Sequence, residues 1–189
     1  MRILEVIEEI RVVLREEFDV DIQQNSAMSE LSIMMLKTIF PLLPADLEML
    51  YKSYKEQSLY DSHSGEPNCD WLFGSTRLIT AREITKLFKY RMHVANTGQL
   101  DDLKVIGPVK PGGVWREAWM PLTEGPKWFF VCDMDPAPGG HIGQIIYMSV
   151  EDGIVRYVFK SITEMLEVQL ALLKSGERDI FEAEDYFYK

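Results

Sequence analysis

Cysteine and histidine are scarce in this chain. The two cysteines, Cys69 and Cys132, form no Cys-x-x-C pair, and neither they nor the three histidines have the spacing of a zinc site. A framework of several disulfides is therefore excluded, although one bond between these two cysteines stays open. We expect no bound metal and no cofactor.

Long apolar runs are also missing. No run approaches the roughly 20 residues that span a bilayer. The N-terminal segment is interrupted by Glu5, Glu8 and Glu9, which is unlike a secretory signal peptide. We expect a cytoplasmic protein that neither crosses nor binds a membrane.

Basic residues are too few to balance the acidic ones. The 20 Lys and Arg face 30 Asp and Glu, for a formal net charge of −10. Binding to nucleic acid needs a basic surface, so nucleic acid is not an expected ligand. An acidic chain suits a basic protein partner, because opposite fields speed encounter, although solubility alone also explains the charge.

What is present suits a single folded domain with a full core. Apolar residues make up 47% of the 189 residues. In the helix predicted over residues 29–40, we expect Leu31, Met34, Met35 and Ile39 to face inward. Helical spacing, prolines and capping boxes predict helices over residues 3–18, 29–40, 44–54, 80–98 and 161–176.

The remaining segments contain short β-prone runs. A tight hairpin is expected at Asp152-Gly153. Along the chain, the predicted helices come first, a meander of strands follows, and a helix closes the sequence. This order is typical of an α+β fold, with a mainly antiparallel central sheet flanked by helices. The β-prone runs cover residues 71–73, 77–79, 114–120, 127–133, 142–149 and 154–159.

Asp133 and Asp135 are the strongest candidates for chemistry. Two carboxylates beside a turn are used in acid–base catalysis and in magnesium sites, and alternation along a strand would place both on one face. No third ligand and no nucleophile accompany them. Asp before Pro and Gly more often fixes a turn, so we expect Asp135→Ala to lower stability by roughly 1–3 kcal/mol. We predict no catalytic residue.

Two further patterns have structural as well as functional interpretations. The glycines between Gly139 and Gly143 are followed by a β-prone run, and no Lys-Ser or Lys-Thr pair comes after them. A phosphate-binding loop leads into a helix and carries such a pair, so this segment is unlike one. Trp115, Trp119 and Trp128 could anchor an interface, but aromatic residues at strand spacing more often fill a core.

Several motifs occur in a fixed order along the chain. Leu43-Pro44-Ala45-Asp46-Leu47 opens one helix, Trp119-Met120-Pro121-Leu122 precedes an acidic turn, and Ser161 to Leu166 opens the last helix. In this order the motifs resemble the SUKH superfamily, the Smi/Knr-type domain. The residues of the central motif are Trp119, Pro121, Asp133, Asp135, Pro136, Gly139, Gly140, Gly143 and Gln144.

The resemblance implies a division of the chain and a function. It implies a SUKH-like domain over residues 27–175, preceded by a helix and connector at 1–26 and followed by an acidic, aromatic tail at 176–189. Members of this superfamily are bacterial immunity proteins that bind and neutralise a cognate toxin, often a nuclease, and fungal scaffolds of cell-wall assembly. The implied partner is a protein toxin, encoded by a neighbouring gene.

Two alternatives to an immunity protein stay open: a regulatory scaffold, and a small-ligand or metal-binding enzyme using Asp133, Asp135 and His141. For a basic toxin, the candidate partner-binding acids are Asp61, Glu66, Asp70, Asp101, Asp102, Glu151 and Asp152.

Overall fold

The computed structural model describes residues 2–18, 27–53, 77–97, 103–124, 128–149 and 151–176. All five predicted helices are present, with ends close to the predicted ones. They are α1 (Arg2–Phe18), α2 (Glu30–Ile39), α3 (Ala45–Ser53), α4 (Ala81–Thr97) and α5 (Ile162–Ser175). No helix among the described residues is long and apolar enough to cross a membrane.

The strands form two sheets. The larger sheet has five strands in the order β2-β7-β6-β5-β3, and all of its pairings are antiparallel except the parallel pair of β2 and β7. The predicted α+β fold with a mainly antiparallel sheet is therefore confirmed. The strands are β1 (Arg77–Leu78), β2 (Lys104–Ile106), β3 (Trp119–Pro121), β4 (Thr123–Glu124), β5 (Trp128–Asp133), β6 (Gln144–Ser149) and β7 (Ile154–Phe159).

Some strand boundaries differ from the predicted ones. The predicted strand over 114–120 is reduced to β3, because the chain turns at 117–118 before it pairs with β5. Residues 104–106, which lie outside all of the predicted β-prone runs, form β2 at one edge of the sheet. The predicted β-prone run at 71–73 lies outside the described residues.

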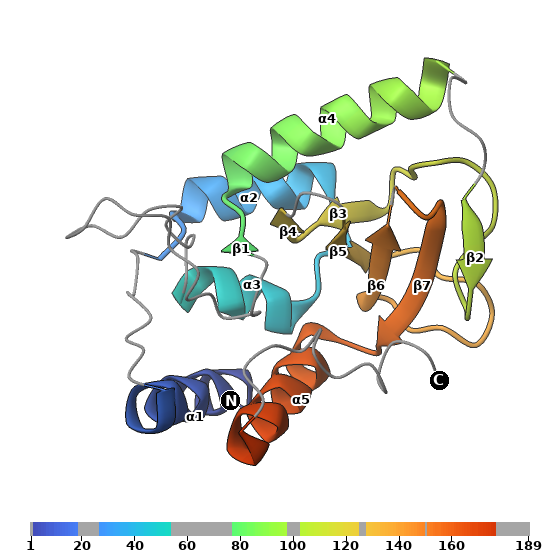
Figure 1. The fold of residues 1–189 in the computed structure, drawn as a ribbon. Helices are drawn as coiled ribbons and strands as arrows, with labels where there is room; N and C mark the ends of the chain where they lie inside the picture. The colour runs from blue at the N-terminus through green and yellow to red at the C-terminus, as the bar shows by residue number, and fades with distance from the viewer. Residues whose placement is uncertain are drawn as a thin grey trace.

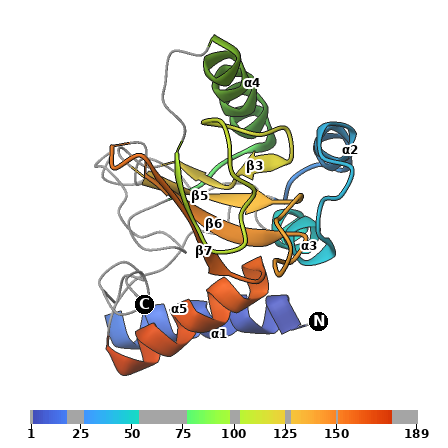
Figure 2. The ribbon, with the colours of Figure 1, turned by 90° about the vertical axis from the view of Figure 1, so that its right-hand side faces the viewer.

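Helices cover both faces of the larger sheet (Figures 1 and 2). Successive residues of β5 point to opposite faces: Phe130 and Cys132 join the core shared with α1, α2, α3 and α5, whereas Phe129 and Val131 join a smaller core beneath α4. Central strands are therefore apolar on both sides, as expected for a sheet enclosed between two layers.

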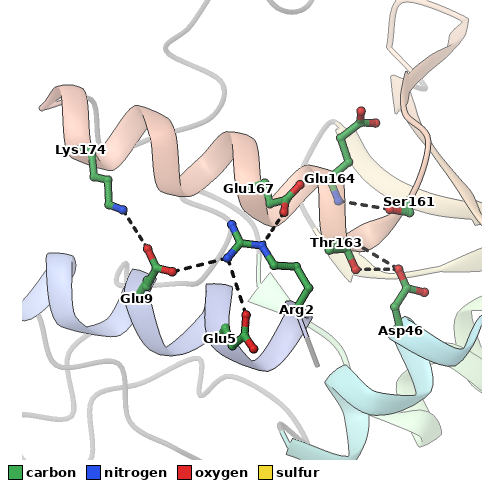
Figure 3. A network of polar contacts seen from close by, with 9 residues as sticks. All are labelled: Arg2, Glu5, Glu9, Asp46, Ser161, Thr163, Glu164, Glu167 and Lys174. Carbon is green, nitrogen blue, oxygen red and sulfur yellow. Dashed lines mark hydrogen bonds and ion pairs between the residues drawn. The ribbon is translucent and has the colours of Figure 1, made fainter.

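α1 packs against α5 and belongs to the larger core (Figure 1). Its buried stripe includes Ile3, Ile7, Ile10 and Leu14, which recur at helical spacings of three and four. At the surface of this pair, Arg2 Nε donates to Glu167 at 2.8 Å, as Figure 3 shows.

Two further polar contacts in the same region join helices. Lys174 Nζ donates to Glu9 at 2.9 Å, adding to the contact between α5 and α1. The Thr163 hydroxyl donates to Asp46 Oδ2 at 2.9 Å, which ties α5 to α3 (Figure 3). Helices distant in sequence are thus held together at this end of the molecule.

The sequence predicts capping boxes at Thr80 and at Ser161. The box at Thr80 is complete, whereas at Ser161 the Glu164 carboxylate accepts from the Lys160 amide instead of the cap amide. The Glu83 amide donates to Thr80 Oγ1 at 3.1 Å, and the Thr80 amide donates to Glu83 Oε2 at 2.9 Å. Glu83 also accepts from buried Arg77, which contacts Glu124 as well and so links β1, β4 and α4. At α5 the Glu164 amide donates to Ser161 Oγ.

The predicted orientation of α2 is largely wrong. Leu31, Met34 and Met35 are exposed by 69%, 64% and 48%, and only Ile39 packs partly against the core. The inward face carries Ile33 and Leu36 instead, and Phe40 follows it. α2 is apolar on both sides, so the choice of face depends on tertiary packing; the Phe40 ring lies 5.0 Å from that of Phe88 in α4.

Candidate functional site

The central motif gathers where three strands meet. Trp119 of β3 lies opposite Asp133 at the end of β5, and Asp133 lies opposite Gln144 at the start of β6. Residues distant in sequence are therefore adjacent in register. The segment between Asp133 and Gln144 leaves the sheet at this point and returns to it.

Asp133 is fully buried and organises this segment. Its Oδ1 accepts from the Asp135 amide at 3.0 Å, and its Oδ2 accepts from Gln144 Nε2 at 2.9 Å. The same Gln144 amide group donates to the Pro108 carbonyl at 2.9 Å, and Gln144 Oε1 accepts from the His141 amide at 3.2 Å. The network therefore joins the two strand ends to the segment before β3.

Burial raises the pKa of Asp133 above its ordinary value of 3.8. The Asp135 amide and the Gln144 side chain oppose this shift, as does the indole of Trp119, which lies nearby without completing a hydrogen bond. The donors favour the charged form but do not fully offset the loss of solvent. A side chain enclosed in this way has no access to a substrate, so its geometry is that of a structural residue.

Asp135 occupies a different environment. Its side chain is 52% exposed and pairs with Lys110 Nζ at 2.5 Å. The expectation that Asp133 and Asp135 share one face of a strand is wrong, because β5 ends at Asp133 and a turn follows. The predicted structural role belongs to Asp133, and the loss expected for Asp135→Ala is only that of an exposed ion pair.

The glycines of the motif allow close packing. A Cβ atom added to Gly140 would lie 2.6 Å from Gln144 Oε1 and 2.7 Å from Pro136 Cβ. Gly143 has a φ of +87°, and a Cβ atom there would collide with the ring of Pro44. Gly139 also has a positive φ, of +93°. No helix begins after these glycines, so the segment is not a phosphate-binding loop.

A cleft of about 550 Å³ opens beside the motif. Most of its lining residues are apolar, but polar and apolar atoms share the exposed lining almost equally, and Asp135 stands on its wall. The Arg116 guanidinium donates to the carbonyls of Pro111 at 2.8 Å and of Gly112 at 3.2 Å, so main-chain oxygens hold it in place. The lining residues are Ile39, Phe40, Pro41, Leu42, Met92, Gly112, Trp115, Arg116, Glu117, Ala118, Met134 and Asp135.

A comparison with protein families decides which family this fold represents. The model of the SMI1 / KNR4 family (SUKH-1) matches residues 41–168, about two thirds of the chain. The protein belongs to the SMI1/KNR4 (SUKH-1) family. A search of the curated proteins found no match. The matched region contains the whole larger sheet, α3 and α4, whereas α1 and α2 precede it.

The two central tryptophans are core residues. Trp115 and Trp119 are buried, with their rings in a T-shaped contact at a centroid distance of 5.9 Å. They fill the core beneath α4 and do not form an exposed anchor. Pro121, the other β3 residue of the motif, is buried as well.

The candidate acids fall largely outside the described residues. Asp61, Glu66, Asp70, Asp101 and Asp102 all lie there. The two that are described sit in one hairpin: Glu151 is exposed, and Asp152 accepts from the Ser149 hydroxyl at 2.6 Å. Neither Glu151 nor Asp152 lines the cleft.

The acidic excess of the chain is unevenly distributed along the sequence. The described residues contain 17 of the 30 acids and 16 of the 20 bases, so they are almost neutral. The excess belongs to the other segments, chiefly 54–76 and the tail from 177. An electrostatic contribution to binding must therefore come mainly from those segments.

Neither a metal site nor a catalytic group is evident in the part of the chain that the structure describes. No cluster of three or more His, Cys, Asp and Glu side chains there could hold a metal ion. His141 contributes its backbone amide to the motif. Sequence reasoning missed the cleft residues Leu42, Met92 and Glu117. They come from three separate segments, which only the tertiary fold brings together, and no shared sequence signal marks them.

Proposed function

We propose that this protein is a bacterial immunity protein that binds and neutralises a cognate toxin, without catalysis, in the cytoplasm. The observation that carries the proposal is membership of the SMI1/KNR4 (SUKH-1) family, together with the motif order that resembles toxin-immunity members of the SUKH superfamily. The toxin belongs to a polymorphic-toxin or contact-dependent system and is encoded by a neighbouring gene.

The site chemistry supports binding. The central carboxylate, Asp133, is buried and satisfied by its own chain, and Asp135 pairs with Lys110. Among the described residues no nucleophile, base and orienting group come together. The exposed lining of the cleft is polar and apolar in nearly equal measure, a mixture typical of the surfaces by which proteins bind one another.

The charge of the chain supports a basic partner. A nuclease-type toxin must present a positive surface to phosphate, and an acidic protein can compete for that surface. Complementary charge raises association rates to about 10⁸ M⁻¹s⁻¹ or above at low salt. Because the described body is almost neutral, we assign this steering to acids in segments 54–76, 98–102 and 177–189.

Co-expression tests the proposal. The neighbouring toxin gene is induced in a host with and without this protein, and survival is scored. We expect growth to be rescued only when the two genes are a cognate pair, so a toxin from an unrelated system is the matched control. Failure to rescue growth, together with failure of the two purified proteins to bind, would reject the immunity function.

A regulatory scaffold is the second candidate, since the resemblance also extends to fungal members in cell-wall assembly. It predicts several stable partners and no rescue of growth. A pull-down that recovers the toxin as the main partner argues against the scaffold.

A further inference from the structure

The outward face of α4 carries a row of basic side chains. Arg82, Lys86 and Lys89 recur at spacings of four and three residues, so they share one face of the helix, and all three are exposed. His93 continues the row one turn further and is exposed as well. Figures 1 and 2 show α4 on the outside of the molecule, across the larger sheet from α1 and α5. We call Arg82, Lys86, Lys89 and His93 the basic stripe.

The basic stripe has no acidic partner among the described residues. Arg82, Lys86 and Lys89 make no hydrogen bond or ion pair with any of them. α4 has a single acid, Glu83, whose carboxylate already accepts from Arg77 and from the Thr80 amide. Most other bases in the described part of the chain do pair with an acid. These paired bases are Arg2, Arg11, Lys37, Lys52, Arg77, Lys110, Lys160 and Lys174.

The arrangement of the basic stripe does not serve the stability of α4. Like charges three or four residues apart on a helix repel each other. Arg82 lies in the first turn, where the helix dipole disfavours a base, and the last turn, where a base would be favoured, has none. Elsewhere the chain places acids at these spacings, as for Glu8 with Arg11 and Glu48 with Lys52. A departure from the rules of helix stability is typical of a functional surface.

The spacing of the basic stripe fits a short run of carboxylates. Neighbouring bases of the stripe lie about 5–6 Å apart along the helix surface. In an extended segment, alternate side chains point to the same side and lie about 7 Å apart, a difference that flexible lysine side chains can span. Tyr90, which is 59% exposed, lies one turn after Lys86 and adds an aromatic ring beside the row. A segment of about five residues with Asp or Glu at alternate positions therefore covers the stripe.

A protein segment is favoured over nucleic acid as the occupant. Phosphate groups could meet the same bases, but three permanent charges neutralise only a few of them. The chain as a whole has a formal net charge of −10, which repels a long polyanion beyond the stripe. A short acidic segment meets the stripe without bringing further negative charge to the rest of the molecule.

We propose that the basic stripe of α4 is a docking surface for an acidic segment of a partner protein. Carboxylates of that segment pair with Arg82, Lys86 and Lys89. The inference goes beyond the proposed immunity function and does not depend on it. A basic toxin is repelled by the stripe, so the acidic partner is a different protein from the toxin.

The test measures binding of the full chain to a defined acidic probe. The probe is a labelled synthetic peptide of alternating Glu and Ser, about ten residues long, and the same peptide with Gln in place of Glu is the uncharged control. Fluorescence anisotropy follows binding from low to high salt. We expect the acidic peptide alone to bind, with an affinity that falls as salt is raised.

Two triple variants show whether the stripe binds the peptide. The stripe variant combines Arg82→Gln, Lys86→Gln and Lys89→Gln, and we expect it to raise Kd at least about tenfold. The control variant combines Lys52→Gln, Lys160→Gln and Lys174→Gln, which removes three exposed bases that are already paired with acids. It changes the net charge equally, and we expect it to change Kd less than about twofold.

Thermal unfolding of the variants separates binding from a structural role. We expect the stripe variant to keep or raise the thermal midpoint, because it relieves repulsion along α4. A lower midpoint would mean that the stripe stabilises the fold, and the docking assignment would be wrong. Arg82→Lys, which keeps the charge, should retain peptide binding.

The remaining outcomes overturn the proposal in different ways. If the acidic peptide does not bind at low salt, or binds both triple variants equally well, the stripe is not a docking surface. If a short DNA duplex binds more tightly than the peptide and loses affinity in the stripe variant, the occupant is nucleic acid and the protein assignment is wrong. The immunity function stands in each case, because rescue of growth from the toxin tests it separately.

Discussion

Replacing Asp133 by alanine should destabilise the protein far more than the same change at Asp135. In the folded protein Asp133 accepts from the Asp135 amide and from Gln144 Nε2, with no exposure to solvent. Asp133→Ala leaves the Asp135 N–H and one Gln144 N–H without an acceptor. The second Gln144 N–H keeps its bond to Pro108.

The magnitude follows from these two donors. Each unsatisfied buried group costs about 1–3 kcal/mol, and release of the buried carboxylate from its desolvated site offsets part of that loss. We expect Asp133→Ala to lower the free energy of unfolding by about 2–4 kcal/mol. In a chain of this length the thermal midpoint falls by roughly 2–4 °C for each kcal/mol, or by about 4–16 °C in total.

Asp135→Ala is the matched control. It removes an ion pair in which Lys110 and Asp135 are 37% and 52% exposed, and such pairs contribute about 0–1 kcal/mol. Circular dichroism during heating, together with urea unfolding, measures both variants. If Asp133→Ala stays within about 1 kcal/mol of the wild type, or if Asp135→Ala is the more damaging, the structural assignment of Asp133 is wrong.

Three further predictions follow from the same structure. Burial raises the pKa of Asp133, so its contribution to stability is present below the ordinary pKa of 3.8 and is lost as the pH rises through the folded pKa. The free energy of unfolding of the wild type, relative to that of Asp133→Asn, should therefore increase on acidification. Urea unfolding at several pH values measures it. Gly143→Ala should cost more than about 1 kcal/mol, because its φ is positive and its Cβ atom would collide with Pro44, and it should cost more than Gly153→Ala, whose Cβ atom meets no neighbour; equal midpoints would contradict this. Removal of residues 1–18 should abolish cooperative unfolding and expose apolar surface to dye, because α1 supplies a buried stripe of the larger core; a folded, dye-negative truncation would contradict it.

Local sequence signals predicted most of the fold. Helix ends were predictable where a capping residue, a proline or a glycine fixes them, as at Thr80, Pro44 and Gly176. The antiparallel strands followed from β-prone runs separated by turns. β2 was not predictable, because a three-residue strand at a sheet edge depends on its pairing with β7 and has no pattern of its own.

The candidate site was harder to predict, since it depends on a few residues whose environments sequence does not fix. Asp133 and Asp135 are two residues apart, and only the end of β5 between them decides that one is buried and the other exposed. The face of α2 was ambiguous because Ile33 and Leu36 form one apolar side while Met34 and Met35 form part of another. Packing against α4 resolves an ambiguity that periodicity alone leaves open.

The central claim is that this SUKH-1 protein acts by binding a toxin, and titration of a toxin's activity tests it most directly. The purified product of the neighbouring toxin gene is assayed on its substrate while this protein is added in rising amounts, with its mass in complex measured in parallel. We predict complete inhibition at one equivalent and a stable complex with a Kd on the order of nanomolar or below. Undiminished toxin activity at a large excess, with no complex formed, would contradict the account.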